Sequence, residues 1–214
     1  MDSLYGEKYF KWQKQIGEFG GQANLFKFEK YITKKKDVLD FGCGGGYLLK
    51  NINTDGKKIG IEINPAAREE AIENGIKCYS DLQEVEDNSV DVIISNHALE
   101  HVEYPSDILR EFKRVLRNGG FIVVVVPHES SKKVNMTDHN MHLYTWSPQT
   151  LVNLFKVCDI NVIGYESICH MWMPHYQKIQ EKFGWKIFHK LCWLYCKIKG
   201  TGYQTCVIGT VRKD

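Results

Sequence analysis

Residues 38–49 limit the fold of this 214-residue chain more than any other stretch, because an apolar run, an acid, a glycine cluster and a helical pattern follow one another directly. This order predicts a strand, a tight turn and a helix. Glycine stands at positions 42, 44 and 46, so the backbone of the turn can bend sharply and approach a ligand closely. The turn is therefore a candidate ligand site.

The residues around this turn indicate which ligand it selects. A dinucleotide fingerprint that starts at Gly42 needs its last glycine where this chain has Tyr47. Asp40 would repel a pyrophosphate but attract a cation. Glu62 ends the next apolar run, ~20 residues after Gly42, where an acid of a βαβ unit accepts hydrogen bonds from ribose hydroxyls. The expected ligand is a nucleoside that carries a positive charge and no phosphate.

At these residues the chain resembles the class I S-adenosylmethionine-dependent methyltransferases, on the pattern Asp40-x-Gly42-x-Gly44-x-Gly46 followed by Glu62. A second stretch, Leu99-Glu100-His101-Val102, is similar to the signature of the subgroup that acts on small molecules. The resemblance covers residues 30–165 and implies S-adenosylmethionine as the cofactor. The cofactor-binding residues that it implies are Asp40, Gly42, Cys43, Gly44, Glu62, Ile63, Asp81, Leu82 and Asn96.

Two of these implications have alternatives in the sequence. The resemblance implies that Asp81 holds the adenine amino group, whereas Ser80 or Asp81 could equally cap a helix or turn. The Asn/Asp-Pro-Pro-aromatic motif of enzymes that methylate planar base amino groups is absent after the strand pattern at 90–95. This absence argues against nucleobase methylation and against DNA as a partner.

The alternation of strand and helix patterns predicts an α/β fold with a doubly wound, Rossmann-like sheet. The resemblance implies seven strands, mostly parallel, with an antiparallel last strand. The expected strands are residues 37–41, 58–62, 76–79, 90–95, 121–126, 160–168 and 203–211. The expected helices are residues 46–52, 66–74, 105–116 and 147–157.

We expect one domain over residues 1–214, with two helical additions. The aromatic segment 5–31, interrupted by Gly20-Gly21, predicts two helices joined by a flexible point. Residues 1–35 would then form a lid, with Tyr5 and Trp12 as aromatic walls, or would simply pack on the sheet. Residues 169–200 are expected as a helical insertion before the last strand.

Composition and charge indicate a soluble, cytoplasmic protein. Hydrophobic residues make up 43% and charged residues 25%, and no tract reaches the ~18 apolar residues of a membrane helix. The seven cysteines contain no C-x-x-C pair, so reduced thiols are expected. The oligomeric state stays open.

The carboxyl-terminal part of the chain is basic. Lysines 178, 182, 186 and 190 follow one another at one-turn spacing, opposite an expected apolar face. A solvated helix face is the default interpretation. The alternatives are attraction of a phosphorylated or nucleotide-linked acceptor, of an anionic membrane surface, or of RNA.

Histidines are the candidate proton acceptors of the reaction, because a hydroxyl acceptor must lose its proton. His97 follows the strand pattern at 90–95, and His139 and His142 lie in the long polar segment 127–146. Asp138 together with His139 and His142 could also collect a divalent metal, but we expect none.

The sequence thus predicts an enzyme that transfers a methyl group to a small polar acceptor. A hydroxyl of a sugar, or of a phosphorylated or nucleotide-linked metabolite, is the preferred acceptor, since loop histidines could serve as bases. The alternatives are an N-methyltransferase of a small amine, an RNA-modifying enzyme, and a cofactor-binding module without catalysis.

Overall fold

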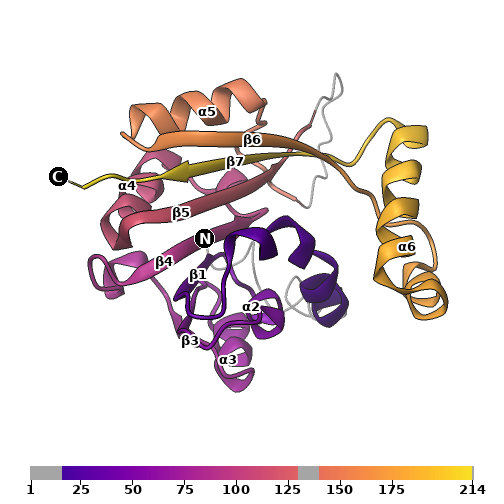
Figure 1. Cartoon of the computed structure of the whole chain (residues 1–214), viewed down its shortest axis with the longest axis horizontal. Coiled ribbons are helices and arrows are strands. Elements are labelled where there is room, and N and C mark those ends of the chain that lie inside the picture. Colours follow the sequence, from indigo (N-terminus) through magenta and orange to yellow (C-terminus); the bar gives the residue numbers. More distant parts are fainter. Residues whose placement is uncertain (1–15, 130–139, 214) are drawn as a thin grey trace.

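A single seven-stranded sheet crosses the protein in the order β3-β2-β1-β4-β5-β7-β6 (Figure 1). The computed structural model describes residues 16–129 and 140–213. All neighbouring strands pair in parallel except β7, which runs antiparallel to both β5 and β6. The predicted doubly wound sheet with an antiparallel last strand is therefore confirmed. The strands are β1 (Val38–Phe41), β2 (Lys58–Ile61), β3 (Lys77–Tyr79), β4 (Val90–Asn96), β5 (Leu116–Pro127), β6 (Asn161–Cys169) and β7 (Tyr203–Thr210).

Helices connect the strands, and three of them begin at a proline, whose fixed φ suits the first helical position. Asn64 caps α3 by accepting hydrogen bonds from the backbone N–H groups of Ala66 and Ala67. The α-helices are α2 (Tyr47–Asn51), α3 (Pro65–Glu73), α4 (Pro105–Val115), α5 (Pro148–Val157) and α6 (Tyr176–Lys199). The 3₁₀ turns are η1 (Leu25–Lys27), η2 (Glu29–Tyr31), η3 (Leu82–Glu84) and η4 (Leu99–His101).

The core consists of two layers, one on each face of the sheet, because successive strand residues point to opposite faces. Leu39 and Ile93 face the layer that contains Phe112 of α4 and Phe155 of α5. The alternate strand residues, among them Val38 and Val92, face the layer that contains α2 and Phe28. None of the seven cysteines, all of which are described, forms a disulfide.

Several predicted boundaries and one predicted hinge were wrong. Strand β5 begins at Leu116 rather than at residue 121, because the chain pairs with Val90 directly after α4. Residues 16–23 are helical straight through Gly20-Gly21, where a flexible point was expected. A Cβ atom on Gly21 would lie 2.4 Å from the carbonyl oxygen of Tyr47, so this glycine serves close packing instead of flexibility. Leu99–His101, within the signature stretch, forms a 3₁₀ turn shortly after β4.

Helix α6 projects beyond the end of the sheet (Figure 1). It bends at Gly184, whose φ of 72° and ψ of 171° are not helical. Its inner face packs against residues 16–23 through a cluster that includes Phe19, Trp172 and Phe188. The predicted apolar face opposite the lysines was Ile179, Phe183, Ile187, Leu191, Leu194, Tyr195 and Ile198. It was wrong at Phe183, Ile187, Leu194 and Ile198, which are exposed, while Ile179, Leu191 and Tyr195 are partly buried. Phe188, Cys192 and Cys196 are the buried residues of the helix. No helix in residues 16–129 and 140–213 is long and apolar enough to span a bilayer.

Candidate active site

The glycine turn between β1 and α2 lies at the carboxyl end of the parallel strands. Gly42, Gly44 and Gly46 have φ values of 75°, 53° and 75°, which a residue with a side chain adopts only at a cost. A Cβ atom on Gly42 would also lie 2.4 Å from the Cβ atom of Ala98, which follows β4. The N–H groups of Gly42 and Cys43 donate to the carbonyl of Ile61, which ends β2. The turn is thus fixed between the ends of two neighbouring strands.

Two pockets meet at Gly42, one on each side of the turn. The first pocket is lined by Asp40, the glycine turn and Asn96, and is covered by residues 16–24 and Trp172. The second pocket has a volume of about 330 Å³ and extends over the ends of β2, β3 and β4. All nine predicted cofactor residues line one of the two: Asp40, Gly42, Cys43, Gly44 and Asn96 the first, and Glu62, Ile63, Asp81 and Leu82 the second, which Gly42 also lines.

The charges of these pockets suit a cation and not a phosphate. Neither pocket is lined by a described lysine or arginine. Asp40 is buried, and burial raises the pKa of its carboxyl well above the ordinary value, with the nearby charge of Glu62 as the second cause. A cationic ligand in the first pocket would offset that cost and favour the ionised carboxylate.

Glu62 is held in one orientation by the backbone. One carboxylate oxygen accepts a hydrogen bond from the N–H of Gly44 at 2.9 Å, and the other accepts one from the N–H of Asn64 at 2.8 Å. Burial raises the pKa of Glu62, and these hydrogen bonds oppose that shift. Since each carboxylate oxygen has more than one lone pair, the group can still accept hydrogen bonds from a ribose.

Asp81 caps a 3₁₀ turn and also lines the second pocket. Its side chain accepts a hydrogen bond from the N–H of Gln83 at 2.8 Å and forms a capping box with Glu84 at the start of η3. The same residue lines the second pocket next to Leu82, which is buried. The cap therefore fixes the carboxylate at the pocket wall.

Lys27 is a site residue that the sequence did not reveal. It is 4% exposed on η1, and its ammonium group donates to Oδ1 of Asn96 at 2.9 Å. Burial lowers the pKa of Lys27 to about 7, although the nearby charges of Cys206 and Glu100 act to raise it. The sequence around Lys27 does not indicate that this residue is buried. The residues that bury it come from β4 and β7, which are distant in the chain.

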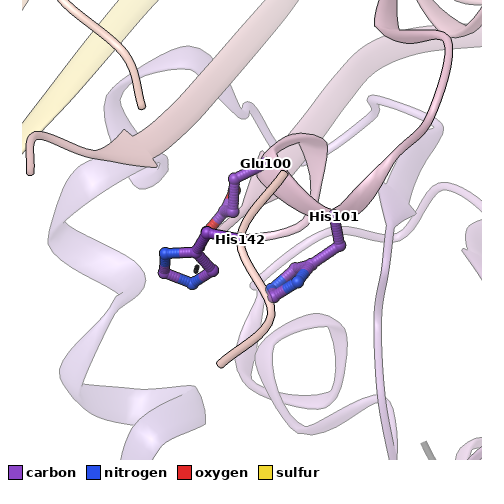
Figure 2. A group of neighbouring side chains, drawn as sticks. All are labelled: Glu100, His101 and His142. Atoms are coloured by element: carbon purple, nitrogen blue, oxygen red, sulfur yellow. Dashed lines mark ion pairs between the residues drawn. The ribbon is translucent and has the colours of Figure 1, made fainter. Parts of the chain in front are cut away.

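A buried carboxylate lies beside the pockets. Glu100 is fully buried in η4, and neither of its carboxylate oxygens has a hydrogen-bond partner among the described residues. Nδ1 of His97 lies 3.5 Å from Oε1 of Glu100, and Nε2 of His142 lies 4.0 Å from the same oxygen. Figure 2 shows the side chains of Glu100, His101 and His142 as neighbours. A buried acid without donors creates a strong preference for a positive charge on its neighbours.

The segment that carries His142 is tied to this turn by its backbone. The N–H of Leu143 donates to the carbonyl of Glu100 at 2.9 Å. Nδ1 of His142 lies 2.9 Å from a carboxylate oxygen of Glu129, after β5. His142 therefore has a carboxylate on each side, an arrangement that fixes the orientation of the ring.

His97 lines the second pocket with a backbone φ of 56°, a conformation that is uncommon for histidine. Its Nε2 lies 3.1 Å from Oε1 of Gln204 on β7, and its Nδ1 faces Glu100. The sequence placed His97 and His142 far apart in the chain, and the structure brings both to one carboxylate. Asp138 and His139, the other members of the predicted loop set, lie outside the described residues.

The cluster also offers atoms that could hold a metal ion. Glu100, His101 and His142 each place one ligand atom within 4.8 Å of the others. Burial lowers the pKa of His101, while the charge of Glu100 raises it. This set differs from the predicted set of Asp138, His139 and His142, and only His142 belongs to both.

Comparison with known proteins identifies the family. Residues 18–166 match the model of a methyltransferase domain. A ubiquinone biosynthesis O-methyltransferase of Nitrosococcus oceani is 34% identical over 128 residues, which are 51% of this chain and 54% of the relative. The uncharacterized protein MJ1123 of Methanocaldococcus jannaschii is 32% identical over 124 residues, which are 56% and 58% of the two chains. The chain thus spans about half the length of the curated relatives it matches.

Solved structures show the same fold at low identity. A chain from the complex between the Trm112 methyltransferase activator and a methyltransferase of Haloferax volcanii has a TM-score of 0.69 and 16% identity, over 100% of this chain and 99% of that one. Phosphoethanolamine N-methyltransferase 2 of Haemonchus contortus has a TM-score of 0.70 and 12% identity, over 99% of this chain and 59% of that one. Because the family model matches residues 18–166, which are most of the chain, this chain belongs to the class I S-adenosylmethionine-dependent methyltransferases.

Proposed function

We propose that this enzyme methylates a hydroxyl group of a small polar acceptor, with the histidines around Glu100 removing the proton. The observation that carries the proposal is the fully buried carboxylate of Glu100, which faces His97 and His142 and has no hydrogen-bond donor among the described residues. A neutral amine acceptor needs no base, whereas a hydroxyl does. A buried acid that favours imidazolium formation is therefore more useful for transfer to oxygen.

The cofactor would be held by the residues that line the two pockets. Asp40 would face the cationic part, the carboxylate of Glu62 would accept hydrogen bonds from the ribose hydroxyls, and Asp81 would accept one from the adenine amino group. When bound, S-adenosylmethionine supplies an electrophilic methyl group. Residues 1–35 would serve as a lid, which is supported by the helical residues 16–23 over the first pocket. Tyr5 and Trp12 of the proposed lid lie outside the described residues.

We assign the role of general base to His142. A carboxylate oxygen of Glu129 lies at Nδ1, so the neutral ring would carry its proton on Nδ1, and Nε2, which lies 4.0 Å from Oε1 of Glu100, would accept the proton of the acceptor. The bound cofactor would supply the methyl group, with its sulfur leaving as a neutral thioether as the S–CH3 bond breaks, and the proton of the acceptor hydroxyl would pass to Nε2 of His142. The imidazolium that forms lies between Glu129 and Glu100, and both carboxylates stabilise it.

His97 would complete the acceptor side as a positioning residue. Gln204 and Glu100 hold its two ring nitrogens, which leaves the ring fixed in the wall of the second pocket. His139 stays a predicted base outside the described residues. A sugar, a phosphorylated acceptor and a cytoplasmic location also stay predictions. The names of the relatives, ubiquinone biosynthesis O-methyltransferases, support oxygen as the acceptor atom.

Incubation with methyl-labelled S-adenosylmethionine and separate pools of hydroxylated metabolites, amines and tRNA tests the proposal. We expect label in the hydroxylated pool and its loss in H142Q, with cofactor binding unchanged by calorimetry. The matched control is His175→Asn, which changes an exposed histidine at the start of α6. Label in amines that survives H142Q, or label in tRNA alone, would contradict transfer to a small hydroxyl.

A further inference from the structure

The outer face of α6 carries both apolar and basic side chains. Phe183, Ile187, Trp193, Leu194 and Ile198 are exposed by 46%, 44%, 53%, 48% and 73%. Lys182, Lys186, Lys190 and Lys197 are exposed on the same helix. Large apolar side chains that are exposed together mark an interaction surface, whereas single ones do not. We call these nine residues the outer face of α6.

The spacing after the bend at Gly184 places the two kinds of side chain in adjacent rows. Ile187, Leu194 and Ile198 recur at intervals of three to four residues or their sums, and so do Lys186, Lys190 and Lys197. The buried residues Phe188, Cys192 and Cys196 occupy the opposite side of the helix. The two rows are therefore neighbours on one exposed side of the helix, with the lysines along one edge of the apolar row.

The charged residues of the helix are almost all positive. Residues 176–199 contain six lysines and a single acid, Glu181. A protein partner of ordinary composition does not need so uniform a positive charge, and a strand of RNA does not need an apolar row beside the lysines. An anionic lipid surface satisfies both, because its headgroups attract lysines and its acyl boundary accepts Trp, Phe and Ile side chains.

The position of α6 in the molecule leaves this face available. Figure 1 shows the helix beyond the end of the sheet, and its inner side packs on residues 16–23. We propose that the outer face of α6 docks this enzyme on an anionic membrane surface, with the helix axis along the bilayer plane. The helix lies on the surface without crossing the bilayer, in agreement with its hydropathy.

Docking through α6 would bring the cofactor site close to the membrane. Trp172, which precedes α6, and Gly20, which packs against Trp172, both line the first pocket. Phe19 contacts Trp172, Tyr176 and Trp185 with ring centroids 5.1, 4.7 and 5.1 Å apart. The segment that covers the pocket is thus attached directly to the inner side of the docking helix.

Sedimentation of the full chain with lipid vesicles tests this proposal. We expect the protein to pellet with vesicles of phosphatidylcholine and phosphatidylglycerol, and to stay in solution with phosphatidylcholine alone. The charge variant K186E/K190E and the apolar variant W193S/L194S should each weaken binding by about tenfold or more. Brominated lipids should quench the fluorescence of Trp193, and the W193F variant should lose that quenching.

Matched control variants change the same residue types elsewhere on the surface. K34E/K35E reverses two exposed lysines before β1, and V157S replaces an exposed apolar side chain, 69% accessible, at the end of α5. Both controls should pellet like the unchanged protein. Circular dichroism and cofactor calorimetry establish that all variants are folded, so that a loss of pelleting reports on the surface.

Four results would overturn the proposal. The first two are that the protein does not pellet with anionic vesicles, or that it pellets equally with neutral ones. The third is that the α6 variants and the control variants change pelleting to the same extent. The fourth is that the protein binds tRNA and that anionic vesicles do not compete for this binding. A dimer in sedimentation velocity that W193S/L194S dissociates, without any binding to vesicles, would assign the outer face to a second copy of this chain instead.

Discussion

Oε1 of the fully buried Glu100 lies 3.5 Å from Nδ1 of His97 and has no hydrogen-bond donor among the described residues. An acid without donors in the protein interior is costly unless a positive charge forms beside it. The proposed reaction forms that charge on a histidine. The carboxylate of Glu100 is therefore placed where the proposed reaction would form a positive charge.

Replacement of Glu100 by Gln should reduce turnover and leave cofactor binding intact. The amide keeps the size of the side chain but removes the charge that stabilises an imidazolium, so we expect kcat to fall by about 10²–10⁴-fold. Single-turnover rates measure the fall in kcat and calorimetry measures cofactor binding, and an unchanged kcat would contradict this role.

The cofactor pockets follow from the sequence because their residues end consecutive strands of one parallel sheet. Asp40, Glu62 and Asp81 come to one edge as soon as the strand order is known. The residues proposed to act on the methyl acceptor could not be predicted from the strand order. Glu100, Glu129 and His142 meet only because Leu143 pairs with the backbone of η4, and no periodic pattern encodes that contact. The predicted apolar face of α6 failed because the helix has apolar residues on both sides.

Removal of divalent metals should leave the methyl transfer unchanged. His142 accepts the proton and Glu100 stabilises the resulting charge, so the proposed chemistry needs no Lewis acid. Treatment with EDTA, followed by an assay in metal-free buffer, should retain full activity. If activity were lost and then restored by Mn²⁺ or Zn²⁺, Glu100, His101 and His142 would be metal ligands and not a base cluster.

Gly42→Ala should abolish cofactor binding, because the new Cβ atom would lie 2.4 Å from Ala98 where the two pockets meet. The φ of 75° adds a backbone cost of about 1–2 kcal/mol. Gly75→Ala is the matched control, since Gly75 has a φ of 81° but no atom within 4 Å of the added Cβ. Calorimetry should show lost binding for the first variant and unchanged binding for the second. Equal effects would mean that strain alone is responsible.

Lys27→Met should remove part of the dependence of stability on pH between 7 and 10.5. Burial lowers the pKa of Lys27 from 10.5 to about 7, so in this window the unfolded chain binds a proton that the folded chain does not. The free energy of unfolding therefore rises with pH as the penalty disappears. Urea titrations at pH 7 and pH 9 should show a rise smaller by about 1–2 kcal/mol in the variant. Lys34→Met, at an exposed position, should leave the rise unchanged.

His170 should make the protein sensitive to acid. It is 6% exposed against Phe26 and Phe188, and its Nε2 lies 3.0 Å from Nδ1 of His189. Burial lowers the pKa of His170 from 6.5 to about 3, with Lys27 and His189 as further causes. The unfolded chain binds this proton first, so stability is complete above pH 6.5 and falls as the pH drops toward 3.

The variant His170→Phe should weaken this acid sensitivity, since a phenyl ring fills the same apolar site without binding a proton. Between pH 6.5 and pH 4, the slope of the free energy of unfolding against pH should decrease by at most about 1.4 kcal/mol per pH unit. His189, whose pKa burial also lowers, retains a part of the slope. Urea titrations at several pH values measure it, with His175→Asn as the exposed control. Because His170 joins α6 to η1, an unchanged slope would mean that this junction opens before the rest of the chain unfolds.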